Sequence, residues 1–278
     1  MALAACMLSA CSSENAEEDV FNGSSAENDT EVTLTFSPYR VEEMTRTIAP
    51  ISDYCNHLDV WIVEGDNVVD IHQESTDADF GVLSVSLNKT KTYTLYAVGH
   101  KANGAATLSN GVIAFPEEKV THTFFYSTTF SPSTTTTLSC VMQRIVGMFR
   151  FEVADVIPDE AYTMTFSLGH TYTRWNVAGY GLNFAERTVT FENFSRNSDG
   201  TAAFSMYFIP ANLTDQELHD ITVTATASDG SLVESKTFEA VPIRANYKTT
   251  YHGQFFTTTA MSISFQADDW SSFDAVIF

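Results

Sequence analysis

The chain has 278 residues, which is enough for two ordinary domains or one large all-β domain. Its 35 acidic residues outnumber 14 Lys and Arg, and the net charge of -21 excludes nucleic acid as a partner because like charges repel. Charged residues make up only 18% of the chain, while Phe and Tyr number 21 and 11, which is typical of half-buried strands. No internal apolar run approaches the roughly 18 residues that a bilayer-spanning helix needs.

The amino terminus has the pattern of an export signal. Residues 1–10 are apolar and small, and they end in Leu8-Ser9-Ala10 directly before Cys11. Such a segment fits the cleft of a signal peptidase, and the four residues resemble the lipobox of bacterial lipoproteins. The resemblance implies cleavage before Cys11 and fatty acylation of its thiol, for example with palmitate. A disordered terminus with an incidental cysteine is the alternative, and the lack of a basic segment leaves the true start codon open.

Residues 11–30 are predicted to form an acidic flexible tether. They are rich in Ser, Asn, Asp and Glu and lack apolar periodicity, so they cannot bury enough surface to offset the entropy of ordering. The acidic run behind Cys11 also resembles the surface-export signal of Bacteroidetes lipoproteins. It implies an outer-membrane lipoprotein that faces the environment at the cell surface.

Alternating apolar and polar residues predict a first series of strands. Turn residues at 64–67 and at 88–91 predict that the strands on either side of each turn form a hairpin. A short helical piece is expected between Pro38 and Asn56. The predicted strands are 32–36, 58–63, 68–71, 82–87, 93–98 and 121–126.

A Ser, Thr and Pro-rich stretch at 127–139 separates this series from a second one, and a domain boundary is predicted at 135/136. A hairpin turns at 228–231, and a short helical piece is expected at 215–219. The strands of the second series are 145–153, 162–168, 188–191, 204–209, 221–227 and 261–265. Short strands with frequent turns predict an all-β protein of two tandem β-sandwiches, over 31–135 and 136–278.

The positions of the Cys and His residues along the sequence give little indication of a catalytic or metal site. Cys55 and Cys140 either form one disulfide in an oxidising compartment or remain two separate buried thiols, and the second alternative is favoured. The seven His residues are scattered, with none at metal-ligand spacing from another. No nucleophile, phosphate-binding or zinc motif is present. The expectation is therefore a protein with no catalytic residues, no metal and no cofactor.

Two stretches allow a weaker ligand hypothesis. Residues 77–81 carry two Asp in a turn and could bind calcium, although a solvated loop is strongly favoured. Tyr172 and Trp175, in Tyr172-Thr173-Arg174-Trp175, could stack on a sugar ring. Ordinary packing is the favoured alternative for these aromatic side chains too.

The C-terminal part carries a family resemblance. Residues 241–257 run Val-Pro-Ile-Arg-Ala-Asn-Tyr-Lys-Thr-Thr-Tyr-His-Gly-Gln-Phe-Phe-Thr and resemble the strand-turn-strand signature of Bacteroidetes fimbrillin-like proteins. The stretches 93–100 and 144–158 are similar to the same family. Arg244 lies two positions before Asn246, whereas the family places its Arg next to the Asn. The resemblance implies two transthyretin-like β-sandwiches, no enzymatic activity and a role as pilus stalk, tip or anchor subunit.

The resemblance also implies an assembly mechanism. Stalk subunits of this family are lipoprotein precursors that a trypsin-like protease cuts after an Arg, which frees a groove for a neighbour's strand. Arg46 follows the first predicted strand and is the candidate cut site, with a plain surface Arg as an equal alternative. The apolar end supplies a candidate donor strand with Phe273, Ala275, Val276, Ile277 and Phe278, or it closes its own sandwich.

The implied partners are other fimbrial subunits, the outer membrane through a lipid anchor, and a ligand on a host or bacterial surface. The alternative function is a surface glycan-binding lipoprotein.

Overall fold

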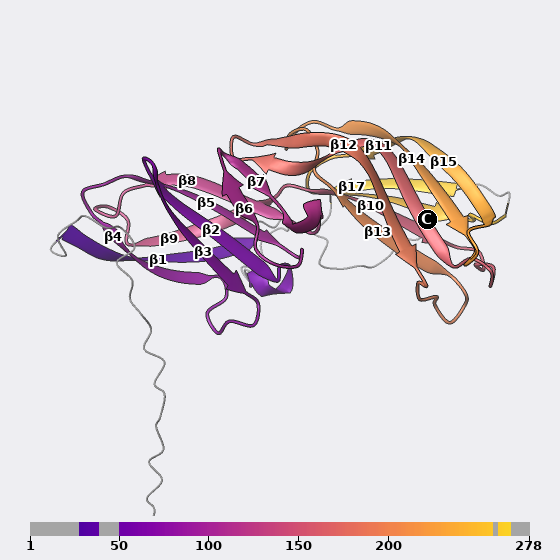
Figure 1. Ribbon diagram of the computed structural model, residues 1–278, viewed down its shortest axis with the longest axis horizontal. Helices are drawn as coiled ribbons and strands as arrows, with labels where there is room; N and C mark the ends of the chain where they lie inside the picture. Colours follow the sequence, from indigo (N-terminus) through magenta and orange to yellow (C-terminus); the bar gives the residue numbers. More distant parts are fainter. Residues whose placement is uncertain (1–27, 39–49, 258–260, 268–278) are drawn as a thin grey trace, which may run out of the picture.

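The computed structural model describes residues 28–38, 50–257 and 261–267. Almost every regular element within these residues is a strand, and the helical elements are two 3-10 turns, η2 (Ile51–Asp53) and η3 (Pro116–Glu118). The all-β prediction is confirmed. Figure 1 shows two lobes that lie side by side along the long axis, the first formed mainly by the first half of the chain.

The first lobe is a β-sandwich with the strand order β3-β2-β5-β8-β9-β1-β4. β8 and β9 pair only at their ends, through Phe124 with Arg144 and Phe125 with Gln143, so the path divides there into two layers. Apolar residues of both layers form its core. The strands are β1 (Asp29–Pro38), β2 (His57–Glu64), β3 (Asn67–Glu74), β4 (Val82–Asn88), β5 (Tyr93–His100), β8 (Phe124–Phe130) and β9 (Thr137–Arg144).

The predicted hairpin of 82–87 with 93–98 is wrong. β4 pairs with β1 at one end of the sheet path, while β5 lies between β2 and β8. The turn at 88–91 therefore carries the chain from one layer to the other. Alternation reports that a segment has one buried face, but it does not report which strand lies next to it.

The second lobe packs the sheet β13-β10-β16-β17 against a sheet that contains β15, β14 and β11. Phenylalanine dominates its core, with Phe149 and Phe151 from one sheet facing Phe166 from the other. β11 pairs with β14 along one edge and with β12 along the other. The strands are β10 (Gly147–Val153), β11 (Thr163–Asn176), β12 (Tyr180–Glu192), β13 (Ala202–Phe208), β14 (Glu217–Thr226), β15 (Leu232–Ile243), β16 (Tyr247–Gly253) and β17 (Met261–Ala267).

The two predicted helical pieces have different outcomes. η2 lies in the first expected range as a single 3-10 turn. The helical piece expected at 215–219 is wrong, because β14 begins at Glu217 and residues 217–219 pair with β15.

A segment of the first half belongs to a sheet of the second lobe. β6 (Thr107–Ser109) and β7 (Val112–Ala114) form a small hairpin, and β7 pairs with the end of β11. Conversely, β9 begins after the predicted boundary at 135/136 and pairs with β1 and β8 of the first lobe. A third apolar cluster, which we call the junction core, lies where these segments meet. Its buried members are Trp61, Val98, Ala106, Ile113, Phe115, Val120, Phe125, Ile145, Val146, Met148, Trp175 and Ile209.

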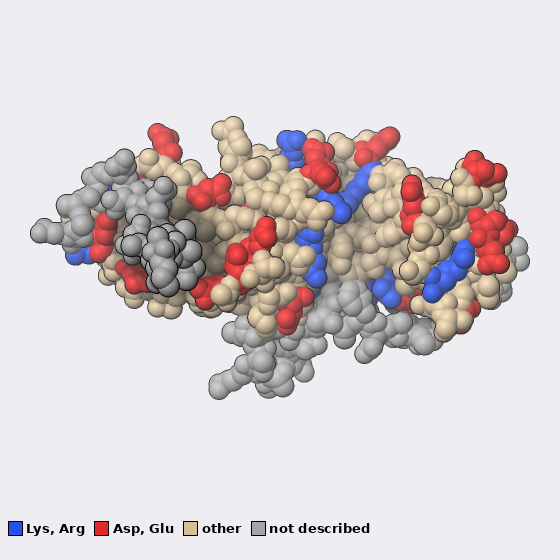
Figure 2. All heavy atoms as spheres, turned by 60° about the horizontal axis from the view of Figure 1, so that its bottom comes forward, with Lys and Arg blue, Asp and Glu red and all other residues tan. Residues whose placement is uncertain are grey.

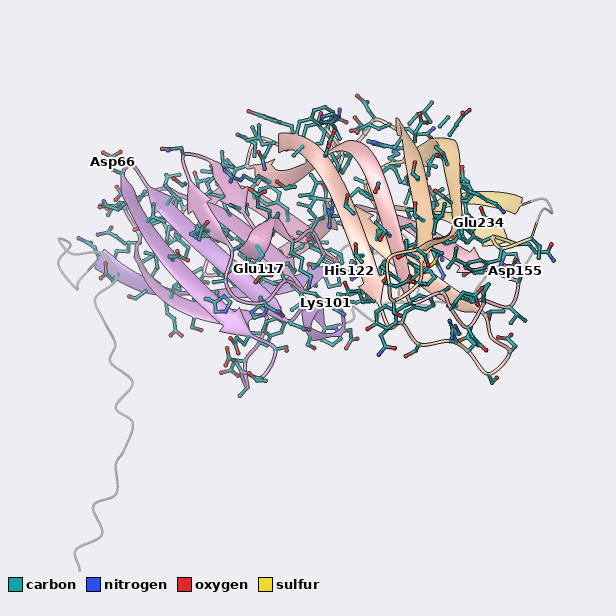
Figure 3. All side chains as sticks on the ribbon, turned by 45° about the vertical axis from the view of Figure 1, so that its right-hand side comes forward. Asp66, Lys101, Glu117, His122, Asp155 and Glu234 are labelled. Carbon is teal, nitrogen blue, oxygen red and sulfur yellow. The ribbon has the colours of Figure 1, made fainter. Side chains whose placement is uncertain are left out.

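Buried polar contacts also join the lobes. The Arg144 guanidinium donates to the Asn246 side-chain oxygen at 2.7 Å and to His122 Nε2 at 2.9 Å. The His122 ring lies parallel to that of Tyr207, with centroids 5.8 Å apart. Figure 3 shows His122 and Lys101 near the boundary between the lobes, and Figure 2 shows blue Lys and Arg side chains gathered near the middle of the molecule.

His122 makes the fold sensitive to acid. Burial, assisted by the positive charges of Arg144 and Lys101, lowers the pKa of His122 from 6.5 to about 2. The unfolded chain therefore takes up a proton below pH 6.5 that the folded chain does not, and the contribution of this group to stability falls as pH drops from 6.5 towards 2.

We expect the wild type to lose about 1 kcal/mol more unfolding free energy between pH 6 and pH 5 than the His122→Gln variant. Urea denaturation followed by circular dichroism at each pH measures this difference. The slopes with pH are compared, so a uniform loss of stability in the variant does not affect the result. Parallel slopes for the two proteins would contradict the prediction.

Candidate functional site

Several residues that the sequence singles out lie outside the described residues. They are Cys11, Arg46, Phe273, Ala275, Val276, Ile277 and Phe278. Their predicted roles in lipidation, cleavage and strand donation stay predictions. In the part of the chain that the structure describes, no helix has the length and apolar character needed to cross a membrane.

The aromatic pair proposed for sugar stacking is occupied within the protein. Trp175 is completely buried in the junction core, where its ring lies 6.2 Å from that of Phe125. A ring with no exposed face cannot stack on a glycan, so the stacking hypothesis for Trp175 is corrected. Tyr172 is half-buried and its ring packs against Phe184 at 5.0 Å. The glycan-binding alternative thereby loses Trp175, one of the two residues that suggested it.

Cys55 and Cys140 are both free thiols buried in the core of the first lobe. The sequence allowed either one disulfide or two separate buried thiols, and the structure has two separate buried thiols. Burial raises the pKa of the Cys55 thiol well above its usual range and that of Cys140 to about 12. Both side chains therefore act as small apolar groups and not as nucleophiles.

β1 occupies a slot inside the sheet path of the first lobe. It pairs antiparallel with β4 and parallel with β9. Its alternating side chains Val32, Leu34 and Phe36 are at most 3% exposed and belong to the core. A strand with neighbours on both sides and a fully buried face is a large part of what closes the sandwich.

β10 has the equivalent place in the second lobe. It pairs antiparallel with β13 and parallel with β16, just as β1 pairs with β4 and β9. The two strands differ in how they join the chain. β10 follows β9 directly through Ile145 and Val146, whereas residues 39–49, which include Arg46, lie between β1 and the rest of the first lobe.

A cluster of polar side chains lies on the outer face of β2. Leu58, Val60 and Ile62 point into the core of the first lobe, so His57 and Asp59 point to the opposite face. Register places His57 between Glu74 of β3 and His100 of β5, and places Asp59 opposite His72 of β3. Three strands thus bring three imidazoles and two carboxylates together, and we call these five residues the histidine cluster.

Asp59 is the centre of the histidine cluster. Its carboxylate is 1% exposed and accepts hydrogen bonds from His72 Nδ1 at 2.6 Å, from His100 Nε2 at 2.9 Å and from the Ala106 amide at 3.0 Å. The Ala102 amide donates to His100 Nδ1 at 3.1 Å, which leaves His100 Nε2 as the protonated nitrogen of a neutral ring. Asp59 is a buried charge that three donors satisfy.

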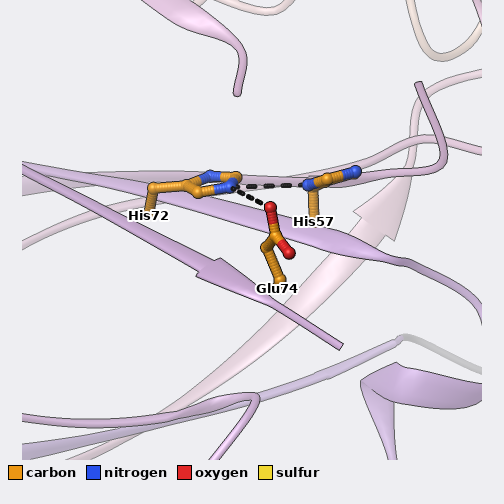
Figure 4. A group of neighbouring side chains, drawn as sticks. All are labelled: His57, His72 and Glu74. Carbon is orange, nitrogen blue, oxygen red and sulfur yellow. Dashed lines mark hydrogen bonds and ion pairs between the residues drawn. The ribbon is translucent and has the colours of Figure 1, made fainter. Parts of the chain in front are cut away.

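The remaining members lie at the solvent-open edge of the cluster. His72 Nε2 faces His57 Nδ1 at 3.4 Å and Glu74 Oε1 at 3.9 Å, as Figure 4 shows. The His72 and Glu74 side chains are 30% and 58% exposed. Burial, together with the two neighbouring imidazoles, lowers the pKa of His57. His57 is thereby kept unprotonated at neutral pH.

Spacing along the chain misses this group because its members meet across strands. His57 and His72 are fifteen positions apart, which is no linear metal motif. The hairpin predicted around residues 64–67 contained the missing signal. A two-residue loop at Gly65 and Asp66 sets Glu64 opposite Asn67, and counting outward then places His57 opposite Glu74.

A family model described as "Family of unknown function (DUF6562)" matches residues 117–274, which is more than half of the chain. No curated protein matches the sequence.

Three solved structures with a similar fold come from species of Bacteroides. One is a candidate adhesin from Bacteroides thetaiotaomicron, with a TM-score of 0.53, 10% identity, and coverage of 85% of this chain and 95% of that one. Another is a candidate cell adhesion protein from Bacteroides ovatus, with a TM-score of 0.50, 12% identity, and coverage of 85% and 96%. A third, from B. thetaiotaomicron, is described as a candidate polysaccharide-binding protein, with a TM-score of 0.50, 10% identity, and coverage of 85% and 96%. At these identities the similarity is one of fold, and it agrees with the fold that the resemblance to Bacteroidetes fimbrillin-like proteins implied.

The hydrogen bonds of Asp59 predict that loss of its carboxylate strongly destabilises the fold. We expect Asp59→Ala to lower the unfolding free energy by about 3–5 kcal/mol, because buried donors from His72, His100 and Ala106 would lose their acceptor. Urea denaturation at neutral pH measures the loss. Asp66→Ala, in the exposed turn of the same hairpin, is the matched control and should change stability by less than about 0.5 kcal/mol. Equal effects of the two substitutions would show that Asp59 does not organise the cluster.

Proposed function

We propose that this chain, which belongs to the family of unknown function DUF6562, is a non-enzymatic fimbrial subunit or fimbrial anchor for cell adhesion that assembles by β-strand exchange. The observation that carries the proposal is the fold, because a similar arrangement covers 85% of this chain and nearly the whole length of two candidate adhesins. The signature at 241–257 and the lipobox-like sequence before Cys11 support the same role and a location at the cell surface.

The slot that holds β1 is the proposed assembly site. A cut at Arg46 would leave β1 attached only through its ladders with β4 and β9 and through its buried face. An incoming strand of another subunit could then form the same ladders. Its alternate side chains would enter the positions of Val32, Leu34 and Phe36, and this alternation would set the register.

Replacement of β1 by another strand is energetically more favourable than dissociation of β1 to leave an empty slot. Burying a Val, Leu or Phe side chain is worth roughly 1.5–3 kcal/mol each, so an empty slot would leave the first lobe far less stable. A donor strand recovers both these contacts and the backbone hydrogen bonds. As a strand, the apolar end would place Phe273, Ala275 and Ile277 on one face, which would take the positions of the buried side chains of β1.

The same protein would serve as an anchor if Arg46 stays intact. β1 would then remain in its slot, and an acylated Cys11 would hold the chain to the outer membrane. Other fimbrial subunits are the proposed partners in both cases. The two roles differ only in whether the covalent link between β1 and the rest of the first lobe is broken.

Controlled cleavage tests strand exchange. We expect the purified full chain, after limited cutting by an Arg-specific protease, to form a ladder of oligomers that resists dissociation in detergent at room temperature. Arg40 lies in the same segment between β1 and the rest of the first lobe, so the test uses chains that carry Arg40→Gln. In these chains, Arg46→Gln should abolish the cut in this segment and the ladder with it. A chain that lacks residues 271–278 should be cut normally but stay monomeric, because it has no donor strand.

Two results would contradict these expectations. A cut wild-type chain that stays monomeric would exclude strand exchange, and a ladder from the chain without residues 271–278 would exclude that donor. Mass spectrometry of native surface fractions then separates the roles. A mature form that begins at Thr47 indicates a stalk subunit, whereas acylated Cys11 as the only amino terminus leaves the anchor role alone.

A further inference from the structure

The solvent-open edge of the histidine cluster has the composition of a metal site. His57, His72 and Glu74 each offer one ligand atom, and these atoms all lie within 4.8 Å of one another. Two imidazole nitrogens and one carboxylate oxygen form a ligand set that zinc uses in proteins, with a fourth position left for water. The position lies at the ends of β2 and β3, away from the β1 slot in the strand order.

The separation of the two nitrogens fits a shared metal. Zinc binds imidazole nitrogen at about 2.0–2.1 Å, so two nitrogens on one tetrahedral ion lie about 3.4 Å apart. His57 Nδ1 and His72 Nε2 are 3.4 Å apart. That separation is long for a direct hydrogen bond, whose usual range ends near 3.2 Å. Glu74 Oε1 is 3.9 Å from His72 Nε2, and its exposed side chain can close the remaining gap by a small rotation.

The buried Asp59 carboxylate prepares one of the ligands. It accepts a hydrogen bond from His72 Nδ1 at 2.6 Å, which fixes the tautomer and leaves the lone pair on Nε2, the nitrogen that faces His57 and Glu74. A carboxylate behind a ligating histidine is the usual support of a protein metal site, because it orients the ring and makes it more basic. Here that carboxylate is 1% exposed and is itself oriented by His100 and the Ala106 amide.

The surroundings accommodate a cation. The chain has a net charge of -21, which attracts divalent cations to its surface. In the structure, His57 Nε2 accepts a long contact of 3.4 Å from the Gly104 amide. If His57 Nδ1 bound the metal, the ring proton would be on Nε2, and Nε2 could no longer accept this contact. Gly104 lies in an exposed bend with nothing within 4 Å of the position of a Cβ, so this segment has room to shift.

From this geometry we propose that His57, His72 and Glu74 bind a zinc ion, with Asp59 holding His72 in the ligating orientation and water completing the coordination. The ion joins the ends of β2 and β3 at the edge of the first lobe. The site does not depend on the proposed function, because neither Arg46 nor the C-terminal end contributes to it.

Zinc titration of the full chain, purified without a polyhistidine tag, tests the site. We expect isothermal titration calorimetry at neutral pH to give one zinc ion per wild-type chain. His57→Gln, His72→Gln and Glu74→Gln should each weaken binding by about 10-fold or more, and Asp59→Asn should weaken it by about 10–100-fold. His170→Gln, which removes an exposed histidine from β11, is the matched control and should bind as the wild type does.

Three further measurements separate ligation from general damage. Glu74 is an exposed residue at the end of an edge strand, so Glu74→Gln should fold normally by circular dichroism. Zinc should raise the melting temperature of the wild type more than that of Glu74→Gln. X-ray absorption at the zinc edge should detect two imidazole ligands in the wild type and one in His57→Gln. Unchanged affinity in the three ligand variants, or no binding to the wild type at micromolar zinc, would overturn the proposal and leave a hydrogen-bonded cluster.

Discussion

The alternation of side chains along β2 is the constraint that the first lobe and the junction both depend on. One face of this strand sends Leu58, Val60 and Ile62 into the core, while the other face carries Asp59 and Trp61. A slip of one residue would place a carboxylate in the core and leucine in the histidine cluster, so the register is strongly specified. Asp59 then accepts a hydrogen bond from the Ala106 amide. Ala106 directly precedes the hairpin of β6 and β7, and β7 pairs with β11 of the second lobe. The polar cluster and the contact between the lobes are therefore parts of one arrangement.

The sequence predicts the strands better than their neighbours. Most predicted strands are present, and the hairpin at 64–67 is correct, because local alternation and turn chemistry determine both. The pairing of 82–87 with 93–98 fails for a reason that local pattern cannot supply. β4 and β5 each have one buried face, and only the packing of the whole sandwich decides that they lie in different layers. The same limit explains β6 and β7, whose three-residue strands acquire a role only against β11.

The candidate sites were accessible to sequence reasoning to different degrees. Trp175 illustrates the failure, because a Trp near a Tyr has the same local pattern whether it faces a ligand or, as here, the junction core. The histidine cluster illustrates an unused signal. The predicted turn already sets Asp59 opposite His72 and His57 opposite Glu74. What no local pattern could supply is His100, which β5 brings from further along the chain to the other side of β2.

The position of β1 also bears on why exchange would take place there and not at an outer strand. β3 is an end strand of the first sheet path, yet its exposed Asp70, His72 and Glu74 place charge and polarity along the open edge. Such side chains oppose pairing with another chain. A strand added beside β3 would gain one ladder, whereas a strand that enters the β1 slot gains two ladders and a buried apolar face. An intact β1 fills that slot, so under the proposed function the position between β4 and β9 would become available to another strand only after the covalent link of β1 is cut.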